Sequence, residues 1–332
     1  MSLALLAFVA IVPLAFTLWR TRRIEARFPA TGGMIVGEGL RLHVTRREPA
    51  GAPRGVVVLV HGASGNQADM MLPLGDRLAA CGFRVFAVDR PGHGHSARLT
   101  RAASSPAAQA RAIRTAIEAS GVTRAIVVGH SWAGSVAVNF LLEHDDLCEG
   151  ALLLAPVTHP WPGGVRWYYR LAAQPVVGWL FAYLLVMPLG LALLETSIDG
   201  VFAPNPAPSR YAERIGAALA LRPAAFRANA RDVVDLRAFL ELQAPRMGAI
   251  KHPVAILSGD RDGVALTERH SFGSARDIPG AILMMLKGVG HSPHWIDPDA
   301  TVAAIVSVLD RAQSARDIRP DMSSSAPSTS SQ

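Results

Sequence analysis

One serine stands in a context that could make it a nucleophile. Ala125–Val128 is apolar and rich in β-branched residues, which is typical of a buried strand, and Ser135–Leu142 is typical of a helix. A serine on a tight strand-to-helix turn projects its hydroxyl above the sheet edge and needs small neighbours. Ser131 is therefore the candidate nucleophile, and the backbone N–H of Trp132 would point at an oxyanion formed on its substrate. The turn departs from G-x-S-x-G only in Ala133, which is small enough for close packing.

Other apolar segments end in polar loops, in a regular order along the chain. These pairs are Val56–Val60 before His61–Gly65, Val85–Asp89 before Arg90–Ser96, Val254–Ser258 before Gly259–Asp262, and Ile282–Leu286 before Gly288–His291. Together with the serine turn, they closely resemble the α/β-hydrolase superfamily, serine-nucleophile branch, from about Val56 to Ala312. The resemblance implies an α/β-hydrolase fold, with a mostly parallel central sheet flanked by helices and an inserted helical cap.

The same resemblance suggests a base and an acid for the serine, which is a weak nucleophile until a base takes its proton. His291 falls where the superfamily has its histidine, and His294 is the alternative. Asp260 and Asp262 compete as the acid, and the family pattern G-x-x-D favours Asp262. The chain order Ser131, Asp262, His291 is the order of this fold.

The loop after the first buried strand resembles the family's first oxyanion segment. Ala63 would supply a second backbone N–H opposite Trp132. We expect His61 to fix this loop through a hydrogen bond. His93 and His95 lie in a glycine-rich loop, but no cysteine or acidic cluster in the sequence completes a metal site with them. Since no P-loop, dinucleotide fingerprint or zinc spacing is present either, the sequence predicts no cofactor and no metal.

Composition narrows the classes of partner. Hydrophobic residues make up 50% of the chain, the mean hydropathy is +0.25, and the formal net charge is +7. The basic residues are scattered arginines without interleaved aromatics, so nucleic-acid binding is not expected, whereas mild attraction to anionic lipid is. Cys81 and Cys148 have no close spacing partner and are interpreted as free thiols, which fits a reducing compartment.

The N-terminal stretch Leu3–Trp19 carries no charge, and as a helix it would extend for ~25 Å, enough for a thin bilayer. Arg20, Arg22 and Arg23 follow at once, and no basic residue precedes the stretch. This charge bias predicts an N-terminal transmembrane anchor, with the catalytic domain in the cytoplasm. The alternative is a signal peptide, with export of the protein after cleavage.

The predicted organisation has five parts: an anchor at 1–24, core at 34–157, a helical cap at 158–247, core again at 248–313, and a disordered tail at 314–332. Within the cap, Val176–Leu194 is uncharged and long enough to resemble a second span. If this segment crossed the membrane once, Ser131 and His291 would lie on opposite sides of the bilayer and could not meet in one active site. We therefore predict a helix pair broken at Pro188, which faces an acyl pocket, lies in the membrane surface, or packs as plain cap core.

These features predict a membrane-anchored, cofactor-independent serine hydrolase. The expected substrate is a small, lipophilic carboxylic ester, as for esterases, lipases or lysophospholipases. The turn Gly129–Trp132 also resembles those of C–C bond hydrolases and proline iminopeptidases, which stay open as alternatives. Two hypotheses from other classes are a non-catalytic α/β-hydrolase-like binding protein and a structural membrane protein with two spans.

Overall fold

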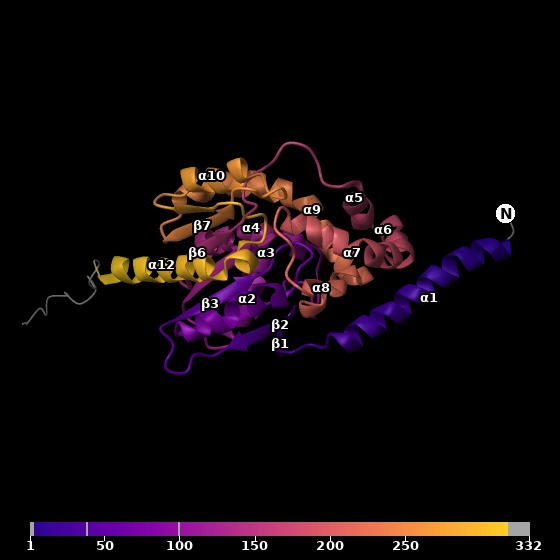
Figure 1. Ribbon diagram of the computed structural model, residues 1–332, viewed down its shortest axis with the longest axis horizontal. Helices are drawn as coiled ribbons and strands as arrows, with labels where there is room; N and C mark the ends of the chain where they lie inside the picture. The colour runs from indigo at the N-terminus through magenta and orange to yellow at the C-terminus, as the bar shows by residue number, and fades with distance from the viewer. Residues whose placement is uncertain (1–2, 38, 99, 318–332) are drawn as a thin grey trace, which may run out of the picture.

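The computed structural model describes residues 3–37, 39–98 and 100–317, and it is built on an eight-stranded sheet (Figure 1). The strand order is β1-β2-β4-β3-β5-β6-β7-β8. The strands are β1 (Gly33–Gly37), β2 (Leu40–Arg47), β3 (Gly55–Val60), β4 (Phe83–Val88), β5 (Ala125–His130), β6 (Cys148–Leu154), β7 (Val254–Gly259) and β8 (Ile282–Leu286). β1 and β2 pair antiparallel, β2 also pairs antiparallel with β4, and the other strands pair parallel. The predicted α/β-hydrolase architecture of the core is thus confirmed.

Strand residues alternate between the two faces of the sheet, because successive side chains in a strand point to opposite sides. Ile126 and Val128 pack with helices α2 (Gln67–Ala80) and α12 (Pro298–Asp317). Val127 packs on the other face, where the helices are α3 (Pro106–Glu118), α4 (Gly134–Glu143) and α10 (Thr267–Asp277). The central strands are therefore covered on both sides, which explains their unbroken apolar runs.

The parallel register brings the ends of the central strands to one edge. Val60 of β3 lies opposite Gly129 of β5, and Gly129 lies opposite Leu153 of β6. The loops that follow these strands therefore emerge side by side, as expected for a ligand site at the carboxyl ends of parallel strands. Three short helices lie in loops of the core: η1 (Arg101–Ser104), η2 (Ser131–Ala133) and α11 (Pro293–Ile296).

The segment between β6 and β7 forms a helical cap over this edge (Figure 1). Its helices are α5 (Trp167–Ala173), α6 (Val177–Phe181), the π-helical η3 (Ala182–Val186), α7 (Met187–Phe202), α8 (Tyr211–Arg214), η4 (Ala217–Leu221), α9 (Pro223–Gln243) and η5 (Ala244–Ala249).

The predicted break at Pro188 is wrong. The helix continues without interruption from Val177 to Phe202, and Pro188 lies in the first turn of α7. The π-helical turn Ala182–Val186 immediately precedes it. A proline removes one helical hydrogen bond and crowds the carbonyl four residues earlier, and a wider turn at that point relieves both effects.

The N-terminal helix α1 (Leu3–Arg27) projects from the body beside the cap (Figure 1). Its second half packs there, because Ile24 is buried in one cluster with Val186, Met187 and Leu219. Among the described residues, one helix is long and apolar enough to cross a membrane, and it is the cap helix Val177–Phe202. Membrane insertion of the N-terminal segment stays a prediction.

The C-terminal helix is longer than predicted. α12 continues to Asp317, so the first residues assigned to a disordered tail, 314–317, are helical. Arg316 in its last turn forms an ion pair with the buried Glu149 of β6, which holds this end of the helix on the sheet. Residues 318–332, the rest of the predicted tail, lie outside the described residues.

Candidate active site

Ser131 lies on a sharp turn between β5 and α4. Its φ is +52°, in the left-handed region that L-residues other than glycine rarely adopt. A side chain at Gly129 would meet the carbonyl oxygen of Ala133, and a Cβ at Gly134 would lie 2.6 Å from the Cβ of Pro156. The residues before and after the turn must therefore be small, because a side chain at either position would clash with a neighbouring atom. Ala133 itself has φ of −74°, which any L-residue adopts, so alanine is tolerated at the fifth position of the motif.

The structure brings Ser131, His291 and Asp262 into one hydrogen-bonded chain. His291 Nδ1 lies 2.7 Å from Asp262 Oδ2, and His291 Nε2 lies 2.8 Å from Ser131 Oγ. Since a carboxylate only accepts, Nδ1 carries the proton toward Asp262 and Nε2 is free to accept from the serine hydroxyl. This is the tautomer that a histidine base needs in order to take the proton of a serine.

The environment of Asp262 favours its charged form. Burial tends to raise the pKa of this carboxyl, but the hydrogen bond to His291 and two from backbone amides outweigh burial and hold the pKa below its usual range. Those amides are the N–H groups of Val264 and Ala265, 2.8 and 2.9 Å from Oδ1. Both oxygens of Asp262 are therefore fixed in orientation and remain ionised opposite His291.

The two alternatives from the sequence lie elsewhere. Asp260 accepts the backbone N–H of Gly288 at 2.6 Å and shapes the loop before His291. His294 lies beside Asp69, with its Nε2 3.6 Å from Asp69 Oδ1. Neither belongs to the hydrogen-bonded chain at Ser131.

The loop predicted to provide the oxyanion donors lies against the serine. A Cβ at Gly62 would lie 3.0 Å from the Cβ of Ser131, so this loop and the nucleophile turn are in contact. Ala63 is the next residue of the loop, and Trp132 follows Ser131 in η2. The role of their N–H groups in holding an oxyanion stays a prediction.

His61 fixes this loop, as predicted from the sequence. Its Nδ1 donates to the carbonyl oxygen of Gly62 at 2.8 Å, and its Nε2 accepts the backbone N–H of Arg90 at 3.0 Å. Burial lowers the pKa of His61 to about 4, and the nearby Arg90 charge acts in the same direction. His61 is thus a neutral structural histidine.

A buried ion pair that the sequence did not reveal ties the cap to the nucleophile turn. Arg90 is fully buried, with its guanidinium 4.2 Å from the centre of the Trp132 ring and 2.8 Å from Asp232 of α9. The indole N–H of Trp132 donates to the carbonyl oxygen of Asp232 at 3.0 Å, and Arg98 pairs with the same carboxylate. In the sequence, the only signal of this ion pair is the charge of Asp232 within the cap. Nothing in the sequence shows that Arg90 is its partner.

The cap also contacts the loop that carries His291. Asn205, which follows α7, donates from Nδ2 to the carbonyl oxygen of Gly288 and accepts from the N–H of Gly290, both at 2.9 Å. Ser131 is 8% exposed and His291 is 3% exposed. Both side chains are therefore covered by the surrounding loops and the cap.

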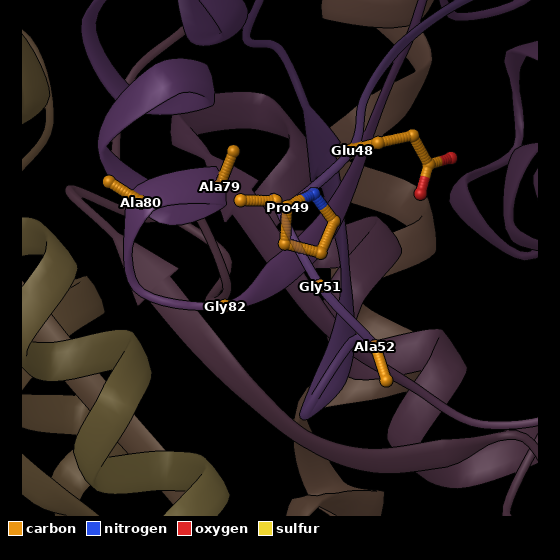
Figure 2. A pocket seen from close by; sticks show the side chains of 8 residues that line it. Glu48, Pro49, Gly51, Ala52, Ala79, Ala80 and Gly82 are labelled. Carbon is orange, nitrogen blue, oxygen red and sulfur yellow. The ribbon is translucent and has the colours of Figure 1, made fainter.

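A surface hollow of about 320 Å³ lies away from this edge (Figure 2). Its walls come from Glu48–Ala52, which precede β3, and from residues at the end of α2, including Gly82 before β4. These segments lie at the amino ends of the parallel strands, opposite the edge where ligand sites form in such sheets. The hollow therefore has no connection with the triad.

Comparison with known proteins agrees with this architecture. A protein of Mycobacterium tuberculosis without an assigned function is 30% identical over 278 residues, covering 78% of this chain and 76% of that protein. The 2-hydroxy-6-oxo-6-phenylhexa-2,4-dienoate hydrolase of Burkholderia cepacia is 25% identical over 255 residues, covering 74% and 84%. The solved structure of an esterase from Exiguobacterium antarcticum superposes with a TM-score of 0.64 at 20% identity, covering 84% of this chain and all of that one.

A family model described as the alpha/beta hydrolase fold matches residues 55–298. The match spans every segment that carries the triad and includes the cap. On this evidence the chain belongs to the α/β-hydrolase family.

Proposed function

We propose that the protein is a serine hydrolase that cleaves an apolar carboxylic ester through an acyl-enzyme. The observation that carries the proposal is the unbroken chain from Asp262 through His291 to Ser131, at 2.7 and 2.8 Å. Such a chain lowers the barrier to attack by removing the serine proton as the new bond forms.

In the proposed reaction, Ser131 Oγ attacks the ester carbonyl while His291 Nε2 takes the hydroxyl proton. Asp262 stabilises the imidazolium, and the N–H groups of Ala63 and Trp132 hold the negative oxygen of the tetrahedral intermediate. The C–O bond of the ester then breaks, and His291 protonates the departing alcohol. Water repeats the sequence on the acyl-enzyme, which releases the acid and restores the serine.

The preference for an apolar substrate is argued from the cap. The continuous helix Val177–Phe202 is rich in leucine, and only 22% of its most apolar window is buried. Leu185, Leu189 and Leu193 are about half exposed. An exposed apolar surface of this kind on the cap favours lipophilic acyl groups.

We also propose that α1 and this cap helix contact a membrane together. Trp19 of α1 is 51% exposed, and the guanidinium groups of Arg20 and Arg23 lie 5.6 and 5.7 Å from the centre of its ring. Tryptophan next to arginine is typical of the boundary between lipid and water. In this proposal the catalytic domain stays on the cytoplasmic side; export after signal-peptide cleavage is the alternative.

The decisive experiment is labelling with a fluorophosphonate, which reacts with activated serines. We expect labelling of the wild type, loss of labelling in Ser131→Ala and His291→Ala, and unchanged labelling in Ser197→Ala, where the serine lies exposed on α7. Absence of labelling in a folded wild type would contradict the proposal and favour a non-catalytic binding protein.

A substrate panel then separates the possible reactions of an activated serine. We expect aryl esters of medium-chain acids to be cleaved faster than acetate esters, because the apolar cap favours longer acyl groups. The relative from Burkholderia cepacia makes C–C bond cleavage of a 2-hydroxy-6-oxo-dienoate the second candidate. Turnover of such a dienoate, or of a prolyl amide, at a higher kcat/KM than any ester would overturn the ester assignment.

Flotation with lipid vesicles tests the membrane proposal. The wild type is expected to float with vesicles that contain anionic lipid, and a variant lacking residues 1–27 to float less. Leu189→Glu and Leu193→Glu should weaken flotation further, because each places a charge on the exposed cap surface. If the wild type and all variants stayed equally in the soluble fraction, the membrane proposal would be refuted.

A further inference from the structure

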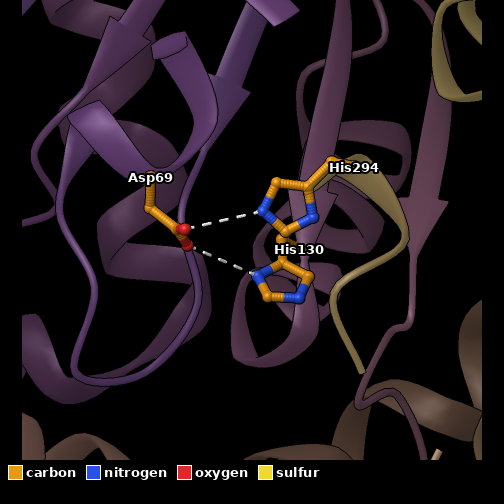
Figure 3. A group of neighbouring side chains, drawn as sticks. All are labelled: Asp69, His130 and His294. Carbon is orange, nitrogen blue, oxygen red and sulfur yellow. Dashed lines mark ion pairs between the residues drawn. The ribbon is translucent and has the colours of Figure 1, made fainter. Parts of the chain in front are cut away.

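A second group of ionisable side chains meets next to the triad, and Figure 3 shows how its members Asp69, His130 and His294 face one another. Asp69 lies in α2, the helix that follows the oxyanion loop. His130 ends β5 and immediately precedes Ser131, and His294 lies in α11, three residues after His291. All three side chains are buried, with exposed fractions of 5% or less for the residues.

The proton of His130 is located by its hydrogen bond. Its Nε2 lies 3.0 Å from the backbone carbonyl oxygen of His291, which can only accept, so Nε2 carries a hydrogen. With that hydrogen on Nε2, the neutral ring carries its lone pair on Nδ1.

That lone pair faces another acceptor. His130 Nδ1 lies 4.0 Å from Asp69 Oδ2 and has no hydrogen-bond partner among the described residues. A carboxylate oxygen only accepts hydrogen bonds, so Asp69 Oδ2 faces this lone pair as a second acceptor. Two acceptors that face one another in a buried setting repel, unless a cation or a donor lies between them.

His294 adds further unpaired nitrogen. It is fully buried, and neither ring nitrogen has a hydrogen-bond partner among the described residues. Its Nε2 lies 3.6 Å from Asp69 Oδ1, beyond hydrogen-bonding distance. Its ring centre is 4.5 Å from that of His130, so the nitrogens of both rings gather around one carboxylate.

The groups around the cluster orient it in the manner of a second coordination shell. Asp69 Oδ1 accepts from the hydroxyl of Tyr211 at 2.7 Å and from the indole N–H of Trp295 at 2.9 Å, which leaves Oδ2 directed at His130. Metal-bound histidines usually donate their other N–H to a backbone carbonyl, and metal-bound carboxylates are usually hydrogen-bonded in turn. His130, through its bond to the carbonyl oxygen of His291, and Asp69, through Tyr211 and Trp295, meet these conditions.

Two glycines keep side chains away from the facing atoms. A Cβ at Gly62 would lie 3.1 Å from His130 Nδ1, and a Cβ at Gly65 would lie 3.6 Å from Asp69 Oδ2. Both glycines belong to the oxyanion loop, so the same loop borders the triad on one side and the histidine–aspartate cluster on the other.

We infer that Asp69, His130 and His294 bind a divalent transition-metal ion, for which Zn²⁺ is the best match. One atom from each residue lies within 4.8 Å of the others. Tetrahedral zinc with bonds of ~2.1 Å sets its ligand atoms roughly 3.4 Å apart, so ring rotations that draw the three atoms in by up to about an ångström and a half complete the set. Two imidazoles and one carboxylate are ligands that zinc accepts, with water in the fourth position.

The inferred role of the ion is to hold three active-site segments together. It would connect the start of α2, the residue before the nucleophile, and the loop that carries His291. His130 is the member of the cluster next to the triad, with its ring centre 5.1 Å from that of His291, so the inferred ion supports the triad and does not bind substrate. The inference does not depend on the substrate proposed above, since metal binding is measured without catalysis.

The test uses tag-free, full-length protein treated with a chelator and then titrated with Zn²⁺ and, separately, with Co²⁺. We expect one equivalent of Zn²⁺ to bind with micromolar or tighter affinity and to raise the thermal unfolding midpoint. Co²⁺ should give the intense visible absorption of a tetrahedral site. X-ray absorption at the zinc edge should show two imidazole ligands together with oxygen ligands.

Matched variants locate the site. His294→Gln and Asp69→Asn should weaken Zn²⁺ binding at least tenfold, the lower end of effects seen even for residues that only support a metal ligand. His252→Gln should bind as the wild type does, because His252 forms an exposed ion pair with Asp145 on the surface.

Three results would overturn the inference. The first is a wild type that binds no Zn²⁺, which would assign the cluster to ordered water. The second is binding that His252→Gln abolishes and His294→Gln retains. The third is an absorption spectrum with fewer than two imidazoles. If a cluster variant fails to fold, the wild-type spectrum alone decides.

Discussion

Two sets of aspartate and histidine side chains lie side by side next to Ser131, and they differ in how their polar atoms are satisfied. In the triad, Asp262, His291 and Ser131 are linked by hydrogen bonds of 2.7 and 2.8 Å. In the second set, Asp69 lies 3.6 Å from His294 and 4.0 Å from His130, and three ring nitrogens have no hydrogen-bond partner among the described residues. The first set is complete as it stands and can move a proton. The second needs a further positive charge or donor, and its position suits it to hold the first in place.

The largest effect should come from removing the charge of the triad aspartate. Asp262→Asn is expected to lower kcat for an ester substrate by roughly 10⁴-fold, because the amide favours the wrong tautomer of His291. The stability should change little, since Asn keeps an acceptor for the loop amides. Asp260→Asn is the control and should stay within a few-fold of the wild type. Equal losses in both variants would mean that the loop, and not the triad, had been disturbed.

An aspartate-to-asparagine substitution in the second set, Asp69→Asn, should affect stability more than activity, the reverse of Asp262→Asn. Asp69→Asn retains an acceptor for Tyr211 and Trp295 but removes a buried negative charge beside two histidines. In the presence of Zn²⁺ we expect the free energy of unfolding to fall by about 1–3 kcal/mol, because the amide binds the ion less well than the carboxylate, and kcat/KM to fall by no more than about tenfold. Denaturant unfolding and ester kinetics on one preparation measure both. A loss of activity as large as that of Asp262→Asn, with stability unchanged, would place Asp69 in the chemistry.

A smaller effect is expected for His130, in the way the free energy of unfolding depends on pH. Its pKa is lowered from 6.5 to about 3, so the folded state keeps it neutral where the unfolded state protonates it. The unfolded chain therefore binds one more proton below pH 6.5, and stability falls as the pH decreases toward the folded value. In the presence of chelator, His130→Gln should reduce the slope of unfolding free energy between pH 6 and 4 by about 1.4 kcal/mol per pH unit. Parallel slopes for the two proteins would contradict the neutral, buried state of His130.

The smallest change concerns the turn between the two sets. Ala133→Gly restores the common form of the nucleophile motif, yet Ala133 already has a φ that suits alanine. The expected change in stability is a loss of about 1 kcal/mol or less, from the added freedom of the unfolded chain, and kcat should stay within about twofold. Thermal unfolding and ester turnover test this. A large gain in activity would show that Ala133 restrains the oxyanion loop.

The sequence was informative wherever function depends on neighbours in the chain. The turn at Ser131 needs small residues within a few positions, and the loops that carry Asp262 and His291 directly follow buried strands. Each of these features leaves a local pattern, so the core architecture and the convergence of the three residues could be anticipated.

The rest depends on residues that meet only in the folded chain. Asp232 pairs with Arg90 from 142 positions away, and Asp69 meets His294 across 225 positions, with no local pattern that links the partners. The unbroken helix through Pro188 depends on a π-helical turn, which no residue preference signals. Likewise, the last helix continues beyond its predicted end because Arg316 pairs with Glu149 of β6, a contact between residues far apart in the sequence.

The left-handed backbone at Ser131 has an evolutionary consequence. Glycine is the residue that suits a φ of +52°, so selection for stability alone would replace the serine and leave an inert but sturdier protein. Persistence of a serine at this position among related sequences would thus be a trace of selection for reactivity, and drift after loss of function should erase it earlier than it erases the surrounding core. In related sequences, glycine at this one position would mark lineages in which the fold has outlived its chemistry.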